Sequence, residues 1–347
     1  AAVRRTVTDL AKGVPHAVAA VNASYFIMPD DPDSLDTPNI DTPTDRGIPG
    51  APAGATAIGG VVEGLPVANR PAVQLTTDGP TFLGNMTAIT SARAGDGSTR
   101  IVTGVNRIPG AGRNCGSLTQ VGTWQQPEQD KTCPVPDDLV EFSSNLGVPL
   151  PATSPPIVIV SNEKVMRRAQ PGDQLNPGEI ALAGTGTSAA WLTEQATTGA
   201  VMSVSVALAP VGGQAIDLSK GDLVSGGPTL VKDSIAQPNS TEGGFAQPDD
   251  PSKTLSWVIR KTARIAYADL GVGRTAFVVV DGRQAGKSEG FGIPDFARYL
   301  KSLGARQAIN LDAGGSTTMV VKGKVVNRPS DPRGQRPVGD AIVITSS

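Results

Sequence analysis

The apolar positions of the chain predict few helices. Helical spacing occurs in residues 3–11, in residues 188–198 and from about Pro294 to Leu303. Each of these segments is followed within two residues by a glycine, which commonly ends a helix, and Pro294 is favourable in a first turn. We therefore expect three helices, each with one face on a core.

Most of the remaining apolar residues fall in short runs between turn residues, which predict strands. Residues 57–105 alternate such runs with turns, as in antiparallel meanders. The clearest expected strands are residues 17–21, 72–75, 100–103, 155–160 and 201–208. The pattern predicts an α+β fold, with twisted mixed or antiparallel β-sheets and a few flanking helices.

The length of 347 residues and a hydrophobic content of 39% allow a large core, in one elaborate domain or in two closely packed ones. Residues 1–215 form an N-terminal portion that contains a long acidic loop and both cysteines. Residues 216–347 form a C-terminal portion in which the chemically suggestive motifs are concentrated. We expect the two portions to build one integrated domain.

Charge and hydropathy exclude two classes of partner. The formal net charge is -2, and basic clusters interleaved with aromatic residues do not occur, so nucleic acid is not expected as the main ligand. No uninterrupted apolar segment reaches membrane-spanning length. The chain starts in an amphipathic pattern, as a mature chain would after removal of a signal peptide.

The two cysteines indicate the compartment. Cys115 and Cys133 lie 18 positions apart in a segment rich in Gly, Pro and Gln, where a disulfide would close a loop. Two unrelated buried thiols are the alternative, but neither cysteine lies in an apolar run. A disulfide is therefore expected, and with it a secreted or cell-surface location.

The segment from Met28 to Ala55 is expected to be a long surface loop, because it is rich in Asp, Pro, Thr and Gly without periodicity. Its acids lack the fixed spacing of a calcium-binding loop, so a solvated loop is the preferred interpretation and structural Ca²⁺ the alternative. The acids concerned are Asp30, Asp31, Asp33, Asp36, Asp41 and Asp45.

Residues 184–189, Gly-Thr-Gly-Thr-Ser-Ala, fit the dinucleotide-binding fingerprint at the start of an expected helix. The context does not fit, because no acidic residue ends the following strand pattern and no strand–helix alternation surrounds it. Capping of the helix by Thr187 or Ser188 explains the same residues. We expect no cofactor.

The most informative segment is residues 308–318, where a buried strand pattern ends at Asp312. The backbone then turns on Gly314 and Gly315, and free N–H groups followed by the hydroxyls of Ser316 and Thr317 could receive an anion or sugar oxygens. An ordinary hairpin with an uninvolved aspartate fits the same pattern. Asp281 likewise follows an apolar run and precedes a glycine, and could point into the same cleft or only form a turn.

Elimination leaves carboxylates and arginines as the candidate chemical groups. His16 is the only histidine, which makes a serine–histidine triad or a zinc site improbable. Two acids are what glycoside hydrolysis usually requires.

Five segments together resemble the phosphodiester glycosidase family. They are Val21-Asn-Ala-Ser-Tyr-Phe26, Asp222-Leu-Val-Ser-Gly-Gly-Pro-Thr-Leu-Val231, Val279-Val-Asp-Gly-Arg283, Ser288-Glu-Gly-Phe-Gly-Ile-Pro-Asp-Phe-Ala297 and the Asp312 turn. The resemblance is dense from about Asp222 to Ile344 and looser before it. Departures are Ala313, where the family usually has a glycine, and the strand that starts at Arg264, which keeps only its arginine and first alanine.

The resemblance implies hydrolysis of a sugar-1-phosphodiester at the sugar C–O bond, with a carbohydrate or sugar-phosphate as ligand. It implies Asp312 as nucleophile or base, Asp281 as second carboxylate or structural partner, and Asn22 as a sugar contact. Planar guanidinium groups suit phosphate oxygens. The remaining expected substrate-binding residues are Gly226, Gly227, Arg264, Arg283, Gly314, Gly315, Ser316, Thr317, Arg328 and Arg336.

Two alternatives remain open from the sequence. One is a glycosidase of the same fold that acts on a cell-wall or capsular polysaccharide without phosphate, which the altered strand at Arg264 favours. The other is a carbohydrate-binding module without catalysis, and the retention of Asp281, Asp312 and Arg283 disfavours it.

Overall fold

The structure, a computed structural model, describes most of the chain. The described residues are 3–28, 47–67, 69–115, 117–118, 124–125, 127–152, 157–170, 172–248 and 250–346. The six acidic residues considered for calcium binding all lie outside these ranges.

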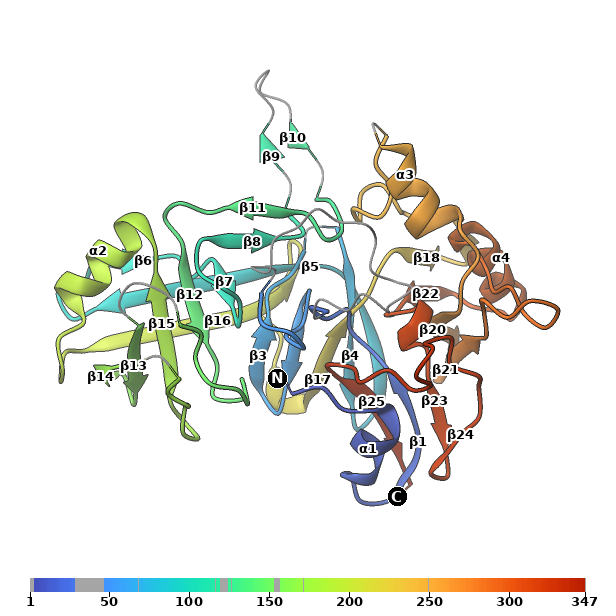
Figure 1. The fold of residues 1–347 in the computed structure, drawn as a ribbon, viewed down its shortest axis with the longest axis horizontal. Helices are drawn as coiled ribbons and strands as arrows, with labels where there is room; N and C mark the ends of the chain where they lie inside the picture. The colour runs from blue at the N-terminus through green and yellow to red at the C-terminus, as the bar shows by residue number, and fades with distance from the viewer. Residues whose placement is uncertain are drawn as a thin grey trace.

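Two antiparallel sheets carry most of the motif-bearing segments (Figure 1). One has the order β19-β18-β22-β20-β21, formed by Ile235–Ala236, Thr229–Lys232, Gln307–Asn310, Arg264–Gly271 and Arg274–Val280. The other has the order β24-β23-β1-β25, formed by Lys324–Val325, Met319–Val321, Ala17–Asn22 and Ala341–Thr345.

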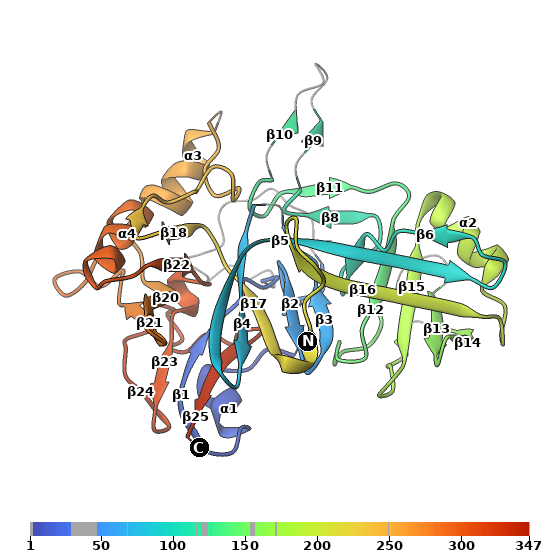
Figure 2. The same cartoon turned by 180° about the vertical axis from the view of Figure 1, so that it is seen from behind.

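Two further sheets build the rest of the body. The larger has the order β16-β5-β4-β17-β2-β3, formed by Met202–Pro210, Gly79–Ala94, Pro71–Thr76, Gly221–Ser225, Thr56–Ile58 and Val61–Gly64, and β6 (Thr99–Arg100) pairs with β5. The other has the order β14-β13-β15-β12-β7, formed by Lys164–Arg168, Ile157–Ser161, Ile180–Gly184, Leu139–Phe142 and Gly104–Val105. The long strands β5 and β16 run side by side toward the part of the molecule that carries α2 (Figure 2).

The small elements complete the architecture. Two-stranded pairs are β8 (Ala111–Arg113) with β11 (Thr132–Pro134), and β9 (Ser117–Leu118) with β10 (Trp124–Gln125). The helices are α1 (Val7–Lys12), α2 (Gly186–Gln195), α3 (Pro251–Thr254) and α4 (Ile293–Ser302), with short helical turns at Leu218–Lys220, Leu255–Ile259 and Gly314–Ser316. Strands thus far outnumber helices, which confirms the predicted α+β class.

Helices α1, α2 and α4 form where the apolar spacing predicts them, whereas α3 was not predicted. In α4, Phe296 and Leu300 are buried against the sheet that contains β18 and β22, and Pro294 stands in the first turn. The start of α2 differs from expectation: neither Thr187 nor Ser188 caps it, and the backbone N–H of Thr187 donates to the carboxylate of Asp137, 2.8 Å away. No helix within the described ranges is both long and apolar enough to cross a membrane.

The sheet that contains β22 is buried on both faces. Leu230, Phe296 and Ala308 belong to a cluster on the α4 side. Ile265 and Ile309 belong to a second cluster that includes Val21 of β1 on the other side. Apolar packing on both faces fixes the end of β22, where the predicted catalytic turn begins.

Strand pairing joins the N-terminal and C-terminal portions of the chain. β1 lies between β23 and β25, and β17 lies between β4 and β2. This interleaving supports one integrated domain rather than two domains divided near residue 215. The single integrated domain stays a proposal.

Two buried carboxyl groups lie where the sheet that contains β3 meets the sheet that contains β12. Glu63 of β3 is fully buried and accepts hydrogen bonds from Asn106 Nδ2 (2.9 Å) and Ser143 Oγ (3.0 Å). Glu141 of β12 is 8% exposed. Burial, together with the charge of Glu63, raises the pKa of Glu141 from 4.5 to about 7.

This raised pKa predicts a pH-dependent stability. The folded protein holds a proton on Glu141 that the unfolded chain releases near pH 4.5, so the stabilisation is complete below that pH and is lost as pH rises through about 7. We expect the unfolding free energy of Glu141→Gln, relative to that of the wild type, to rise by up to about 3 kcal/mol from pH 5 to pH 8. Urea unfolding of both proteins at the two pH values measures this difference. Glu194→Gln is the control, because Glu194 is an exposed residue on α2. Equal pH dependence in wild type and Glu141→Gln would contradict the assignment.

Candidate active site

The turn after β22 places Asp312 between the C-terminal end of β1 and the start of β20. The backbone N–H of Asp312 donates to the carbonyl of Ala23 (2.9 Å), and that of Gly314 donates to the carbonyl of Ala263 (3.0 Å). Gly314 has φ +63°, a conformation that favours glycine. The carboxylate of Asp312 therefore stands on a backbone that is held from two neighbouring strands.

Asn22 closes this turn from the end of β1. Its Nδ2 donates to the carbonyl of Asp312 (2.6 Å), and its Oδ1 accepts from the backbone N–H of Thr318 (2.9 Å). The side chain is fully buried. The sequence suggested a sugar contact for Asn22, but the structure commits both ends of its amide to the two ends of the Asp312 turn.

Asp281 follows β21 and reaches the same turn through an asparagine. Its Oδ1 accepts from the backbone N–H of Arg328 (2.8 Å) and from Nδ2 of Asn327 (3.2 Å). Nδ2 of Asn327 also donates to the carbonyl of Thr317 (3.0 Å). The strands that lead to the two acids lie on either side of β20 rather than next to each other, and Asn327 is the link between them.

The hydroxyl groups of the turn are buried. The Oγ1 atoms of Thr317 and Thr318 have no hydrogen-bond partner among the described residues. Ser316 Oγ instead accepts from Nη1 of Arg336 (3.4 Å). The Oγ1 hydroxyl groups of Thr317 and Thr318 are therefore available to hydrogen-bond a ligand or water.

The predicted arginines make different contacts, and among them Arg336 has a hydrogen bond to the Asp312 turn. Arg264, 3% exposed at the start of β20, donates from Nε to the carbonyl of Phe291 (2.9 Å) and from Nη2 to that of Trp257 (3.2 Å). Arg336 donates from Nε to Oδ2 of Asp331 (2.8 Å). The backbone N–H of Arg283 donates to the carbonyl of Glu289 (3.2 Å), at a φ of +58°. Arg328 contributes its backbone to the Asp281 contact.

Gly226 and Gly227 bring the end of β17 against the end of β22. The backbone N–H of Gly227 donates to the carbonyl of Asn310 (2.7 Å). A Cβ on Gly226 would stand 2.3 Å from that same carbonyl oxygen, so only glycine fits. The central Gly-Gly-Pro segment thus acts through close backbone approach.

Sequence reasoning missed the polar pair formed by Tyr25 and Asn310. The Tyr25 hydroxyl donates to the carbonyl of Gly227 (3.0 Å) and accepts from Asn310 Nδ2 (2.8 Å). Burial raises the pKa of Tyr25, the charge of Asp312 raises it further, and Arg264 and Arg70 act in the opposite direction. Tyr25 therefore stays neutral and lies within electrostatic reach of Asp312. Both residues occur in the motifs that carry the resemblance, which was the available signal.

An aromatic group lies beside this pair. Ring centres of Tyr25 and Phe245 are 5.6 Å apart, and Trp257 lies 6.3 Å from Tyr25 and 6.2 Å from Phe245. These rings come from three separate segments of the chain, and nothing in their local sequence marks them as neighbours. Tyr25 and Phe245 belong to the apolar cluster on the α4 side of the sheet that contains β22, and Trp257 packs against that cluster.

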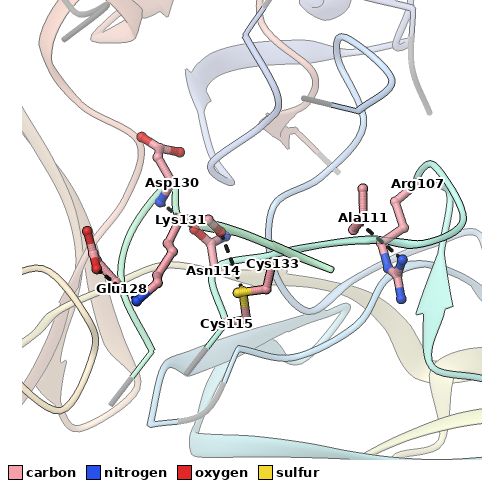
Figure 3. Close-up of a disulfide and its surroundings, with 8 residues drawn as sticks. All are labelled: Arg107, Ala111, Asn114, Cys115, Glu128, Asp130, Lys131 and Cys133. Carbon is pink, nitrogen blue, oxygen red and sulfur yellow. Dashed lines mark hydrogen bonds and ion pairs between the residues drawn. A yellow bond between two sulfur atoms is a disulfide. The ribbon is translucent and has the colours of Figure 1, made fainter. Parts of the chain in front are cut away.

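The disulfide predicted from the sequence is present between Cys115 and Cys133 (Figure 3). Beside it, Asp130 pairs with Arg113 (2.6 Å) and its backbone N–H donates to Asn114 Oδ1 (2.8 Å). The loop that it closes contacts the segment carrying Phe245, because the N–H of Gln129 donates to the carbonyl of Gly244 (2.8 Å).

Removal of the disulfide is expected to destabilise the protein. A Cys115→Ser/Cys133→Ser double variant should lose about 2–4 kcal/mol of unfolding free energy, because its unfolded chain regains loop entropy. Urea unfolding measures the loss, and unfolding of the wild type in reductant is the matched comparison. A variant as stable as the oxidised wild type would show that the bridge contributes nothing.

The described residues contain no group of three or more His, Cys, Asp or Glu side chains placed to hold a metal ion. Asp312 and Asp281 are instead contacted by the amide side chains of Asn22 and Asn327. Neither a solvated acidic loop nor the calcium alternative is tested, because that loop lies outside the described ranges.

A carboxylate turn, buried arginines and a glycine-rich strand end thus occur together on an α+β scaffold. The sequence profile of the phosphodiester glycosidase family matches residues 152–345, more than half of the chain. The chain therefore belongs to the phosphodiester glycosidase family.

Solved structures agree with this fold. A "Putative exported protein" of Burkholderia pseudomallei K96243 superposes with a TM-score of 0.80 at 30% identity, covering 99% of this chain and 68% of that one. A hypothetical protein from Synechocystis superposes with a TM-score of 0.65 at 19% identity, covering 98% of this chain and 54% of that one. The catalytic domain of zebrafish N-acetylglucosamine-1-phosphodiester alpha-N-acetylglucosaminidase, auto-inhibited by its pro-peptide, gives a TM-score of only 0.32 at 15% identity, too loose to align residues; it covers 99% of this chain and 94% of that one. No curated protein is significantly similar in sequence.

Proposed function

We propose that this protein hydrolyses sugar-1-phosphodiesters at the bond between the anomeric carbon and the phosphate oxygen. Water adds its hydroxyl to the sugar, and the phosphate leaves as a phosphomonoester. The observation that carries the proposal is Asp312 on a turn held by Asn22, with Arg264 within electrostatic reach of the same Tyr25. Family membership supplies the reaction class.

Asp312 is the carboxylate that we assign to the reacting centre, as nucleophile or as the base that activates water. It lies at the end of a strand buried on both faces, so its position is fixed relative to the other groups. Asp281 is the second carboxylate, and its hydrogen bonds with Asn327 and the backbone of Arg328 hold it in place. Asn22 acts in this proposal as a positioning residue for Asp312.

The leaving phosphate is a weak base, so it requires positive charge more than a strong proton donor. Arg264, Arg283, Arg328 and Arg336 are the candidates that the sequence suggested for this charge. The Oγ1 atoms of Thr317 and Thr318, which have no partner among the described residues, are suited to sugar hydroxyls or phosphate oxygens. An export route for the protein is supported by its disulfide and by the exported relative.

The test is incubation with a panel of sugar-1-phosphodiesters and neutral cell-wall glycans in water enriched in ¹⁸O. We expect free sugar and phosphomonoester in equal amounts, with the label on the sugar and none on the phosphate. Label on the phosphate would instead show cleavage of the P–O bond. Activity on neutral glycans alone would favour a polysaccharide glycosidase, and binding without hydrolysis a carbohydrate-binding module.

A further inference from the structure

Arg70 is a buried cation that the expected site did not include. It directly precedes β4 and is 2% exposed. Its Nε donates to the carbonyl of Gly243 (2.8 Å), and its guanidinium carbon lies 4.3 Å from the centre of the Phe245 ring. The hydrogen bond and the stacking contact together fix the plane of the guanidinium group.

The outer nitrogens of this group lack partners. Nη1 and Nη2 make no hydrogen bond and no ion pair with any described residue. Tyr25 and, to a lesser extent, Asp130 favour the charged form of Arg70, but the Asp130 carboxylate contacts Arg113 at 2.6 Å. Burial lowers the pKa of Arg70 to about 10, which still leaves it charged at neutral pH. A buried cation without a counter-charge is costly, and such groups are normally paired.

Arg70 also adjoins the candidate active site. Its Cγ lies 3.6 Å from the point where a Cβ on Gly227 would stand, and the carbonyl of Gly227 is the group that accepts from Tyr25 and Asn310. Arg70, Arg264 and Asp312 all act electrostatically on the Tyr25 hydroxyl. The cation is therefore part of the same polar group as the carboxylate that we assign to the reacting centre.

We infer that Arg70 binds an anion, and that this anion is the phosphate group of the substrate. The inference rests on the proposed function for the identity of the anion. Two parallel N–H groups in a fixed plane match two phosphate oxygens, and Nη1 and Nη2 are the donors that the protein leaves for them. Phosphate would supply the counter-charge that no described side chain provides.

Inorganic phosphate is a probe for this site that does not depend on catalysis. Thermal unfolding of the full chain is followed during titration with phosphate at constant ionic strength, set with chloride. We expect the wild type to melt at higher temperature as phosphate rises. Arg70→Met, which keeps much of the packing and removes the charge, should weaken the fitted phosphate affinity at least tenfold. Arg298→Met is the control, because Arg298 is an exposed arginine on α4 that pairs with Asp295.

Arg70→Lys keeps the positive charge but lacks the planar guanidinium group, so it should bind phosphate more weakly than the wild type. If Arg70→Met does not fold, Arg70→Lys alone tests whether phosphate binding depends on the guanidinium group. No phosphate-dependent rise in the wild type, or an equal rise in the Arg70 variants, would overturn the inference. Failure of the proposed function would look different: phosphate binding would still depend on Arg70, but no sugar-1-phosphodiester would be cleaved. If cleavage occurs, Arg70→Met should raise KM for the phosphodiester more than tenfold.

Discussion

Replacing Asp312 with asparagine is expected to lower kcat/KM for a sugar-1-phosphodiester by at least about 10³-fold, because the reaction loses the carboxylate that attacks the anomeric carbon or activates water. The turn should persist, since its contacts with Ala23 and Asn22 use the backbone N–H and carbonyl of Asp312. Measurement of free sugar release against substrate concentration gives the ratio, and the melting temperature reports whether the fold is kept.

Asp295→Asn is the matched control for this change. Asp295 is a half-exposed acid in the first turn of α4, where it pairs with Arg298. Its loss should leave kcat/KM within twofold of the wild type. An Asp312→Asn variant that keeps more than a tenth of wild-type activity would show that Asp312 is not the reacting carboxylate, and Asp281→Asn would then become the decisive variant.

Replacing Arg336 with methionine is expected to lower the free energy of unfolding by about 3 kcal/mol, because it leaves the buried carboxylate of Asp331 without its closest cation. The value falls at the low end for a broken buried pair, since Nε of Arg333 still lies 3.3 Å from Oδ1 of Asp331. Arg336 also donates to Ser316 Oγ, so the Asp312 turn should loosen as well. Urea unfolding at neutral pH measures the loss.

The same pair has a pH signature. Burial raises the pKa of Asp331, but hydrogen bonds from Arg333 and Arg336 outweigh it, and the net pKa is lowered. The stabilisation is therefore present at neutral pH and is lost as pH falls through the lowered pKa.

Arg333→Met is the control for Arg336→Met. Because the Arg333 side chain is 56% exposed, its replacement should lower the free energy of unfolding less than replacement of Arg336. Equal losses in the two variants would refute a special role for the buried pair.

The spacing of apolar residues along the chain predicted individual helices and strands. The apolar face of α4 and the strand that ends before Asp312 both follow from residue spacing, and the structure confirms them. The family signature also followed from contiguous motifs. These features need only the periodicity of helices and strands and the backbone freedom of glycine.

Contacts between distant segments were not predictable in the same way. Arg70 stacks on Phe245 because the Gly227 turn and the disulfide-closed loop bring their segments together. Asp137 caps α2 from 50 positions away along the chain. The family resemblance suggested a sugar contact for Asn22, whereas the hydrogen-bond partners of its side chain in the structure lie 290 and 296 positions later. Side chains of this kind acquire their roles only once the sheets are paired.

The position of β1 between β23 and β25 bears on how this family is dissected experimentally. The stretch recognised by the family profile, residues 152–345, excludes β1, and it also excludes the β5 partner of β16 and the β2 and β4 partners of β17. A fragment cut at that boundary would expose several unpaired strand edges, which favour aggregation. It would also lack Asn22, Tyr25 and Arg70. We therefore expect the half of this protein that the family profile matches to be a unit of recognition by sequence and not a unit of folding.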